Sequence, residues 1–187
     1  MIHLYAFVRG VSRVEAGLEL RPCGSFAAVT GHDDLDPLQH GLVVERLLEE
    51  ADAVLPVRFG ERFETEDELA TAIVPRREAL ERQLDHVAGC VEVGVRIVPC
   101  PEAADRADGA AYMRARLREQ LAAEEVHRVL AEKARDSVQT NRDAGYLVAR
   151  ADVGAFSVAV EHLLESHPAL DVLCTGPWAP YSFAAAT

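Results

Sequence analysis

His86 and Cys90 are the residues whose types and spacing come nearest to nucleophilic catalysis. A thiol beside an imidazole can attack a carbonyl, provided that a base and an oxyanion site lie next to it. The residues that flank this pair match no known nucleophile motif. We therefore interpret Cys90 as a small buried side chain that follows a helix ending near His86.

Histidines also raise the question of a metal site. His162 and His167 are five residues apart and do not match the i, i+4 spacing of ligands on one helix face. His32 with Asp33 and Asp34 could bind a cation in a loop, but we interpret these residues as a solvated acidic turn. The chain has neither G-x-G-x-x-G nor G-x-x-x-x-G-K-[ST]. We predict no catalytic residue, no metal and no cofactor.

The overall charge narrows the class of partner. The 187 residues carry a formal net charge of −12, which disfavours nucleic acid and anionic membranes because both attract positive surfaces. The N-terminal residues lack the basic region of a signal peptide, and no apolar run reaches 18 residues. None of the four cysteines forms a C-x-x-C pair. We expect a soluble cytoplasmic protein.

Start and stop signals outline four helical regions. Asp36 and Pro37 begin a helix that runs to about residue 51, and Thr65 with Glu68 forms a capping box. The second helix should break at Pro75 and resume until Gly89. A long helix is expected over 110–138, and another after Asp152. The apolar positions of these helices predict buried stripes, including Leu38 and Leu42 in the first, and Met113, Leu117, Leu121, Val126, Val129 and Leu130 in the long one.

Apolar and β-branched runs predict the strands. The expected strands cover 2–8, 18–21, 26–30, 54–60, 91–98, 145–150 and 170–174, with 139–144 as a loop. This mixture, without long β-α alternation, predicts an α+β fold with two domains, each a small mixed or antiparallel sheet packed with helices. The predicted domains are 1–98 and 110–187, joined by a Pro/Ala/Asp-rich linker at 99–109.

One predicted strand has an unusual composition. Residues 54–60 read Val-Leu-Pro-Val-Arg-Phe-Gly, with a proline and a charged side chain inside an apolar run. Leu55, Val57 and Phe59 share one face, which we expect to anchor the neighbouring helices. Arg58 lies on the other face, and Glu92 is its expected ion-pair partner if this strand adjoins 91–98.

The C-terminal tail concentrates the aromatic side chains. Residues 175–183 read Thr-Gly-Pro-Trp-Ala-Pro-Tyr-Ser-Phe, although aromatics make up only 6% of the chain. The tail could fold back as a lid on the core. Alternatively, Trp178, Tyr181 and Phe183 form a contact surface, where such residues are favoured anchors.

Together these segments resemble the gas vesicle protein F/L family (GvpF/GvpL). The resemblance rests on residues 54–60 with Phe63 and on the closing motif 175–183. It extends to 4–8, 91–96 and 145–148, and so runs from end to end. Two departures are visible: Ala179 stands where a second proline is commoner, and the chain is short before Gly145. The motif residues expected to be structural are Pro56, Arg58, Phe59, Gly60, Gly176 and Pro177.

The resemblance implies a cytoplasmic accessory or minor structural protein of gas vesicles, the hollow protein shells that give cells buoyancy. Its implied partners are the small, hydrophobic major shell protein and other accessory proteins, and no catalytic residues are implied. It also implies two α+β domains, at least one of them ferredoxin-like. The alternative hypothesis is a regulatory module that binds a small ligand in a cleft of a ferredoxin-like sheet, although the sequence offers no convergent polar pocket for it.

Overall fold

The computed structural model describes residues 1–32, 36–99, 109–140, 143–167 and 170–184. Its internal contacts divide the chain into two compact units: Met1–Val91 together with the chain from Trp178 onward, and Glu92–Pro177. The predicted boundary after residue 98 therefore falls inside the second unit, and only the part of the aromatic tail from Trp178 onward groups with the first. The predicted linker at 99–109 lies almost wholly outside the described residues.

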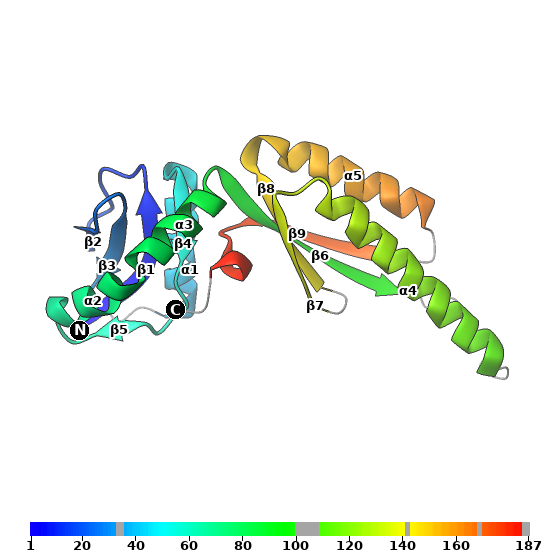
Figure 1. Ribbon diagram of the computed structural model, residues 1–187, viewed down its shortest axis with the longest axis horizontal. Coiled ribbons are helices and arrows are strands. Elements are labelled where there is room, and N and C mark those ends of the chain that lie inside the picture. Colours follow the sequence, from blue (N-terminus) through cyan, green and yellow to red (C-terminus); the bar gives the residue numbers. More distant parts are fainter. Residues whose placement is uncertain (33–35, 100–108, 141–142, 168–169, 185–187) are drawn as a thin grey trace. The chain divides into compact units, whose positions relative to one another are not determined.

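The first unit is a sheet packed with helices (Figure 1). Its strand order is β2-β3-β1-β4, and the short β5 also pairs with β1. In chain order its elements are β1 (Ile2–Arg9), β2 (Leu18–Pro22), β3 (Ala27–Gly31), α1 (Pro37–Glu50), β4 (Ala53–Pro56), β5 (Arg62–Phe63), α2 (Glu66–Ile73), the 3-10 turn η1 (Val74–Arg76), α3 (Arg77–Val87) and the 3-10 turn η3 (Tyr181–Phe183).

Local capping explains where these helices begin. The side chain of Asp36 accepts a hydrogen bond of 2.9 Å from the Gln39 amide, at the start of α1. Thr65 accepts from the Glu68 amide at 3.2 Å, and Glu68 accepts in turn from the Glu64 amide. Each cap satisfies amides that the first helical turn leaves unpaired. The predicted break at Pro75 is confirmed as η1, which separates α2 from α3.

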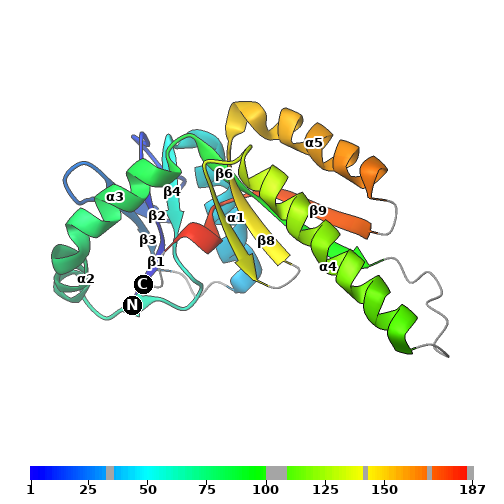
Figure 2. The same ribbon diagram turned by 45° about the vertical axis from the view of Figure 1, so that its right-hand side comes forward.

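Strand β1 is the centre of the first unit. It is buried along almost its whole length, on both faces. Helix α1 lies on one side of the sheet, and α2 and α3 lie on the other (Figures 1 and 2). Strand β4 pairs antiparallel with β1, with Leu55 opposite Phe7 and Pro56 opposite Ala6. Because β4 ends the main strand order, its proline removes no hydrogen bond from the interior of the sheet.

The second unit has the order β-α-β-β-α-β. Its sheet runs β7-β8-β6-β9, which is the ferredoxin-like arrangement. The predicted α+β class with a ferredoxin-like domain is confirmed. The elements are β6 (Cys90–Pro99), α4 (Gly109–Ala131), β7 (Asp136–Thr140), β8 (Asp143–Ala149), the 3-10 turn η2 (Arg150–Asp152), α5 (Val153–Ser166) and β9 (Leu170–Trp178).

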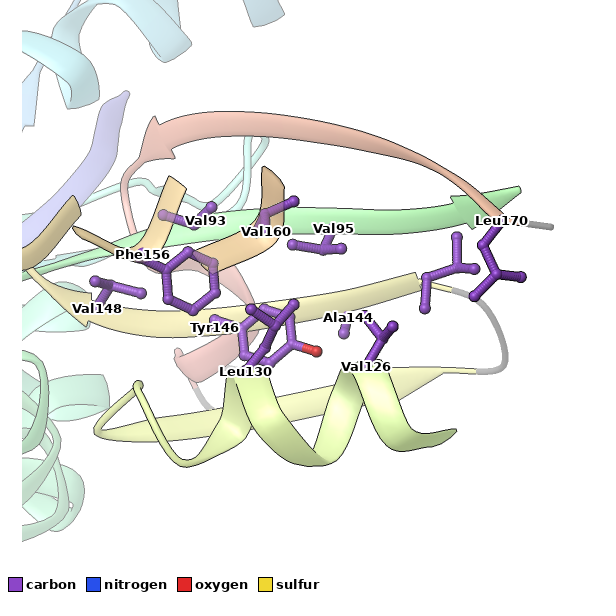
Figure 3. Packing of buried hydrophobic residues seen from close by; sticks show 11 residues of the cluster. Val93, Val95, Val126, Leu130, Ala144, Tyr146, Val148, Phe156, Val160 and Leu170 are labelled. Atoms are coloured by element: carbon purple, nitrogen blue, oxygen red, sulfur yellow. The ribbon is translucent and has the colours of Figure 1, made fainter. Parts of the chain in front are cut away.

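The core of this unit lies between the sheet and its two helices (Figure 3). Tyr146 and Val148 of β8 pack with Phe156 of α5 and with Leu130 of α4. The full buried set is Val93, Val95, Ile97, Val126, Leu130, Ala144, Tyr146, Val148, Phe156, Val160 and Leu170. From α4 the core takes only residues in its C-terminal half.

Three predictions on this unit are wrong. The long helix ends at Ala131 rather than at residue 138. Residues 139–144 were predicted as a loop, but 139–140 belong to strand β7 and 143–144 to β8. These two strands pair antiparallel, with Asp136 opposite Leu147. Strand β9 continues to Trp178, well into the predicted tail. Among the described helices, none combines the length and the apolar character needed to cross a bilayer.

Candidate functional site

The candidate nucleophile is enclosed. Cys90 is buried at the start of β6, whereas His86 lies on the exposed side of α3. A thiol closed off from solvent has no path to a substrate. This geometry matches the interpretation of Cys90 as a packing residue rather than a nucleophile.

The candidate metal ligands lie in separate surroundings. His162 contacts Glu165 at 3.4 Å, and His167 contacts Glu125 at 3.6 Å. His32 lies 3.8 Å from Glu19, while Asp33 and Asp34 are outside the described residues. Within the described ranges, no three histidine, cysteine or carboxylate side chains gather as a metal site would require.

The motif after β4 shapes the backbone. Gly60 has a φ of +104°, a conformation that other residues rarely adopt. The ring of Phe59 packs against the buried imidazoles of His3 and His40, with centroid distances of 5.5 and 5.7 Å. Phe59 is therefore partly exposed, and its ring contacts His40 of helix α1.

Arg58 has a different role from the predicted one. Strand β4 ends at Pro56, so Arg58 is not in a strand, and its side chain is exposed. The condition for a pair with Glu92 is also not met, because β4 pairs with β1 while β6 belongs to the other sheet. No described residue forms an ion pair with Arg58. The expected Arg58–Glu92 pair is thus replaced by a guanidinium that faces solvent.

Two buried residues, Ala179 and Pro180, fix the backbone of the aromatic tail. Gly176 has a φ of +114°, and the Gly176–Pro177 peptide bond is cis. Ala179 and Pro180 are buried, whereas Trp178 and Tyr181 are 46% and 41% exposed. The Phe183 amide donates to the Pro180 carbonyl at 3.2 Å, which closes the η3 turn. We define Trp178, Tyr181 and the half-buried Phe183 as the tail surface.

The tail surface adjoins helix α1. Turn η3 lies beside α1 in both views (Figures 1 and 2). Burial raises the pKa of the Tyr181 phenol, and the nearby carboxylate of Glu45 raises it further. The phenol therefore stays neutral and available as a hydrogen-bond donor. An exposed stripe continues along α1 through Leu38 and Leu42, which we predicted to be buried.

A cavity of about 670 Å³ lies in the second unit, between α4 and the sheet. Its lining includes charges of both signs: Arg116, Glu119, Glu124 and Asp143. Sequence patterns do not reveal this cavity, because its lining comes from five elements: β6, α4, β7, β8 and β9. Its size falls within the usual range for small-molecule sites.

The sequence matches one family model over nearly its whole length. The matched residues are 2–144 and 109–185, and the model describes the "gas vesicle synthesis protein GvpL/GvpF". The chain is 32% identical over 146 residues to gas vesicle protein F2 of Halobacterium salinarum, a match that covers 77% of this chain and 65% of that protein. It is 31% identical to gas vesicle protein F of Haloferax mediterranei, covering 80% of this chain and 70% of the relative.

Two solved structures share the fold. The crystal structure of GvpF from Anabaena sp. PCC7120 superposes with a TM-score of 0.76 at 17% identity, covering 100% of this chain and 96% of that one. GvpF from Microcystis aeruginosa gives a TM-score of 0.74 at 16% identity, covering 98% of both chains.

Proposed function

Because the chain belongs to the gas vesicle synthesis protein GvpL/GvpF family, we propose that it acts in the cytoplasm as an accessory or minor structural protein of gas vesicle assembly. It holds the hydrophobic major shell protein and passes it to the growing vesicle, together with other accessory proteins. It is not an enzyme. The family places the chain with gas vesicles, and the remaining steps of the proposal rest on its surface chemistry.

The observation that carries the proposal is the tail surface. Trp178 and Tyr181 present large apolar faces to solvent, and the buried Ala179 and Pro180 between them fix the backbone. An aromatic side chain held in this way loses little conformational freedom on binding, which makes it a strong anchor for an apolar partner. The net charge of −12 would keep such a complex soluble.

A pull-down with the shell protein tests this role. We expect Trp178→Ala and Tyr181→Ala each to weaken capture at least tenfold, since buried aromatic anchors typically contribute 2 kcal/mol or more. Tyr112→Ala is the matched control, because this tyrosine is 43% exposed in the other unit. Equal capture by all three variants, each with an unchanged melting temperature, would contradict the assigned surface.

Deletion of the gene tests the broader role. Cells that lack the protein should form no vesicles or misshapen ones. Normal vesicles in a deletion strain with no second family member would rule out a role in assembly.

The cavity under α4 favours a second candidate, a regulatory module that binds a small polar ligand. Arg116 pairs with Glu119 at 3.1 Å and Asp143 pairs with Arg96 at 2.6 Å. Each would exchange this partner for an oppositely charged group of such a ligand. Calorimetry with a panel of nucleotides and amino acids checks this alternative. Saturable binding that Arg116→Ala abolishes, combined with no capture of the shell protein, would favour it over the assembly role.

A further inference from the structure

Helix α4 carries an apolar stripe that faces solvent. Met113, Leu117 and Leu121 are spaced by four residues, so they share one face of the helix. Their exposed fractions are 66%, 57% and 54%. We predicted that they would continue the buried stripe of Val126 and Leu130, but only the latter two reach the core.

The geometry of the second unit explains this exposure. The N-terminal part of α4 extends past the end of its sheet (Figures 1 and 2). Core contacts from α4 begin only at Ala122. The side chains of Met113, Leu117 and Leu121 therefore remain in water. Each exposed side chain costs about 1.5–3 kcal/mol relative to full burial.

The stripe has a basic border in an otherwise acidic protein. Arg114, Arg116 and Arg118 are all exposed on the same segment of α4. Within this segment Arg116 pairs with Glu119 at 3.1 Å. A complementary surface would be an apolar stripe with acidic residues beside it.

Helix α1 of the first unit offers such a surface. Leu38 and Leu42 are 72% and 47% exposed, and Glu45 and Glu49 continue the same face of the helix. The neighbouring Arg46 pairs with Glu15 at 2.9 Å, so the face keeps its acidic character.

We propose that α4 of one copy of this chain docks antiparallel on α1 of a second copy. On α1, Glu45 lies seven residues after Leu38, and on α4, Arg114 lies seven residues before Leu121. In each helix this separation is about 10.5 Å. Antiparallel packing then matches the positions in order: Leu38 with Leu121, Leu42 with Leu117, and Glu45 with Arg114. Two leucine pairs and one ion pair give a weak contact that forms at high local concentration.

This contact joins different surfaces of the two copies. A head-to-tail contact of this kind leaves one free α1 and one free α4 on every dimer, so association continues into rings or open chains. The contact lies beside the tail surface, because Glu45 is near Tyr181, but the self-association needs no shell protein. The inference therefore stands or falls separately from the proposed function.

Two complementary variants test the contact. Variant A carries Leu117→Ser and Leu121→Ser, so its α1 surface is unchanged. Variant B carries Leu38→Ser and Leu42→Ser, so its α4 surface is unchanged. All four side chains are exposed, so both variants should fold, and circular dichroism checks this. In sedimentation velocity experiments we expect the unaltered chain to form oligomers at high concentration. Each variant alone should be monomeric, and an equimolar mixture should form dimers and nothing larger.

A charge swap tests the polar part of the same contact. Arg114→Glu should abolish oligomers, and adding Glu45→Arg in the same chain should restore them. Oligomers of the unaltered chain should weaken with salt, because the ion pair lies at a solvated border. A chain that stays monomeric up to millimolar concentration would overturn the proposal. A mixture of variants A and B that fails to associate would also overturn it. So would evidence that the apolar stripe of α4 binds the shell protein instead of a second copy of this chain.

Discussion

Nε2 of His3 donates a hydrogen bond of 3.0 Å to Nδ1 of His40, inside the first unit. The direction follows from the second bond of His40, whose Nε2 lies 2.9 Å from the Val57 carbonyl. A carbonyl only accepts, so this nitrogen carries the proton and Nδ1 of the neutral ring is left as the acceptor. The pair ties β1 to α1 and fixes the chain just before the Arg58-Phe59-Gly60 turn.

This chain of bonds makes stability depend on pH. Burial lowers the pKa of His40, and the hydrogen bond to Val57 offsets part of that effect. A lowered pKa in the folded state means that the unfolded chain binds the proton more readily. The contribution of His40 to the free energy of unfolding should therefore be fully present above about pH 6.5, the pKa of an unperturbed histidine. It should decrease as the pH drops below that value. Thermal melts between pH 7.5 and pH 5 measure this loss.

His40→Gln should flatten this dependence, at a cost of about 1–3 kcal/mol for the buried partners left unsatisfied. His162→Gln is the control, because this histidine is exposed on α5. The melting temperature of the His40 variant could instead fall as steeply with pH as that of the unaltered chain. That result would show that the proton is bound elsewhere. Burial also lowers the pKa of His127 in the second unit, so some dependence should remain.

Arg58→Ala should change the free energy of unfolding by less than about 0.5 kcal/mol, because the side chain is exposed and no described residue forms an ion pair with it. An ion pair with Glu92, as expected from sequence, would instead predict a larger loss, because the variant would leave the carboxylate of Glu92 unpaired. Chemical denaturation gives the value. If the variant keeps its stability but no longer binds the shell protein, Arg58 belongs to the interaction surface. A loss of more than about 2 kcal/mol in the free energy of unfolding would contradict the observed exposure.

The sequence predicted those elements whose signals are local. The caps at Asp36 and Thr65 involve amides only three residues away, so their spacing alone marks the helix starts. Strand β7 was missed for the opposite reason. It is an edge strand whose residues are all exposed, so no alternation of apolar and polar side chains marks it.

Partners that are distant in the chain could not be predicted. Periodicity shows that Leu117 and Leu121 share a face, but not that this part of α4 lies beyond its sheet. Likewise, nothing near Arg58 reveals that β4 pairs with β1. The aromatic tail was identifiable from composition, whereas the position of Tyr181 beside Glu45 depends on how the chain returns to the first unit.

Gly94 allows β9 to approach β6 closely. A Cβ at this position would lie 2.7 Å from Oγ1 of Thr175, the first residue of the closing motif. We expect Gly94→Ala to destabilise the second unit by about 1–3 kcal/mol through overpacking. In the double variant, Thr175→Ala should recover most of that loss, since it removes the clashing atom. Purely additive effects in this double-mutant cycle would contradict the close approach.

The hydroxyl of Tyr146 is hydrogen-bonded to Nδ1 of His127, and both side chains are buried in the second unit. Burial raises the pKa of the phenol, so the hydroxyl keeps its proton. Tyr146→Phe preserves the ring that packs on Phe156 but leaves Nδ1 of His127 without this hydrogen-bond partner. We expect a loss of about 1–3 kcal/mol in the free energy of unfolding. Tyr112→Phe, which changes the same group on an exposed part of α4, should leave the stability within about 0.5 kcal/mol. Equal values for the two variants in urea denaturation would mean that the buried hydrogen bond contributes no net stability.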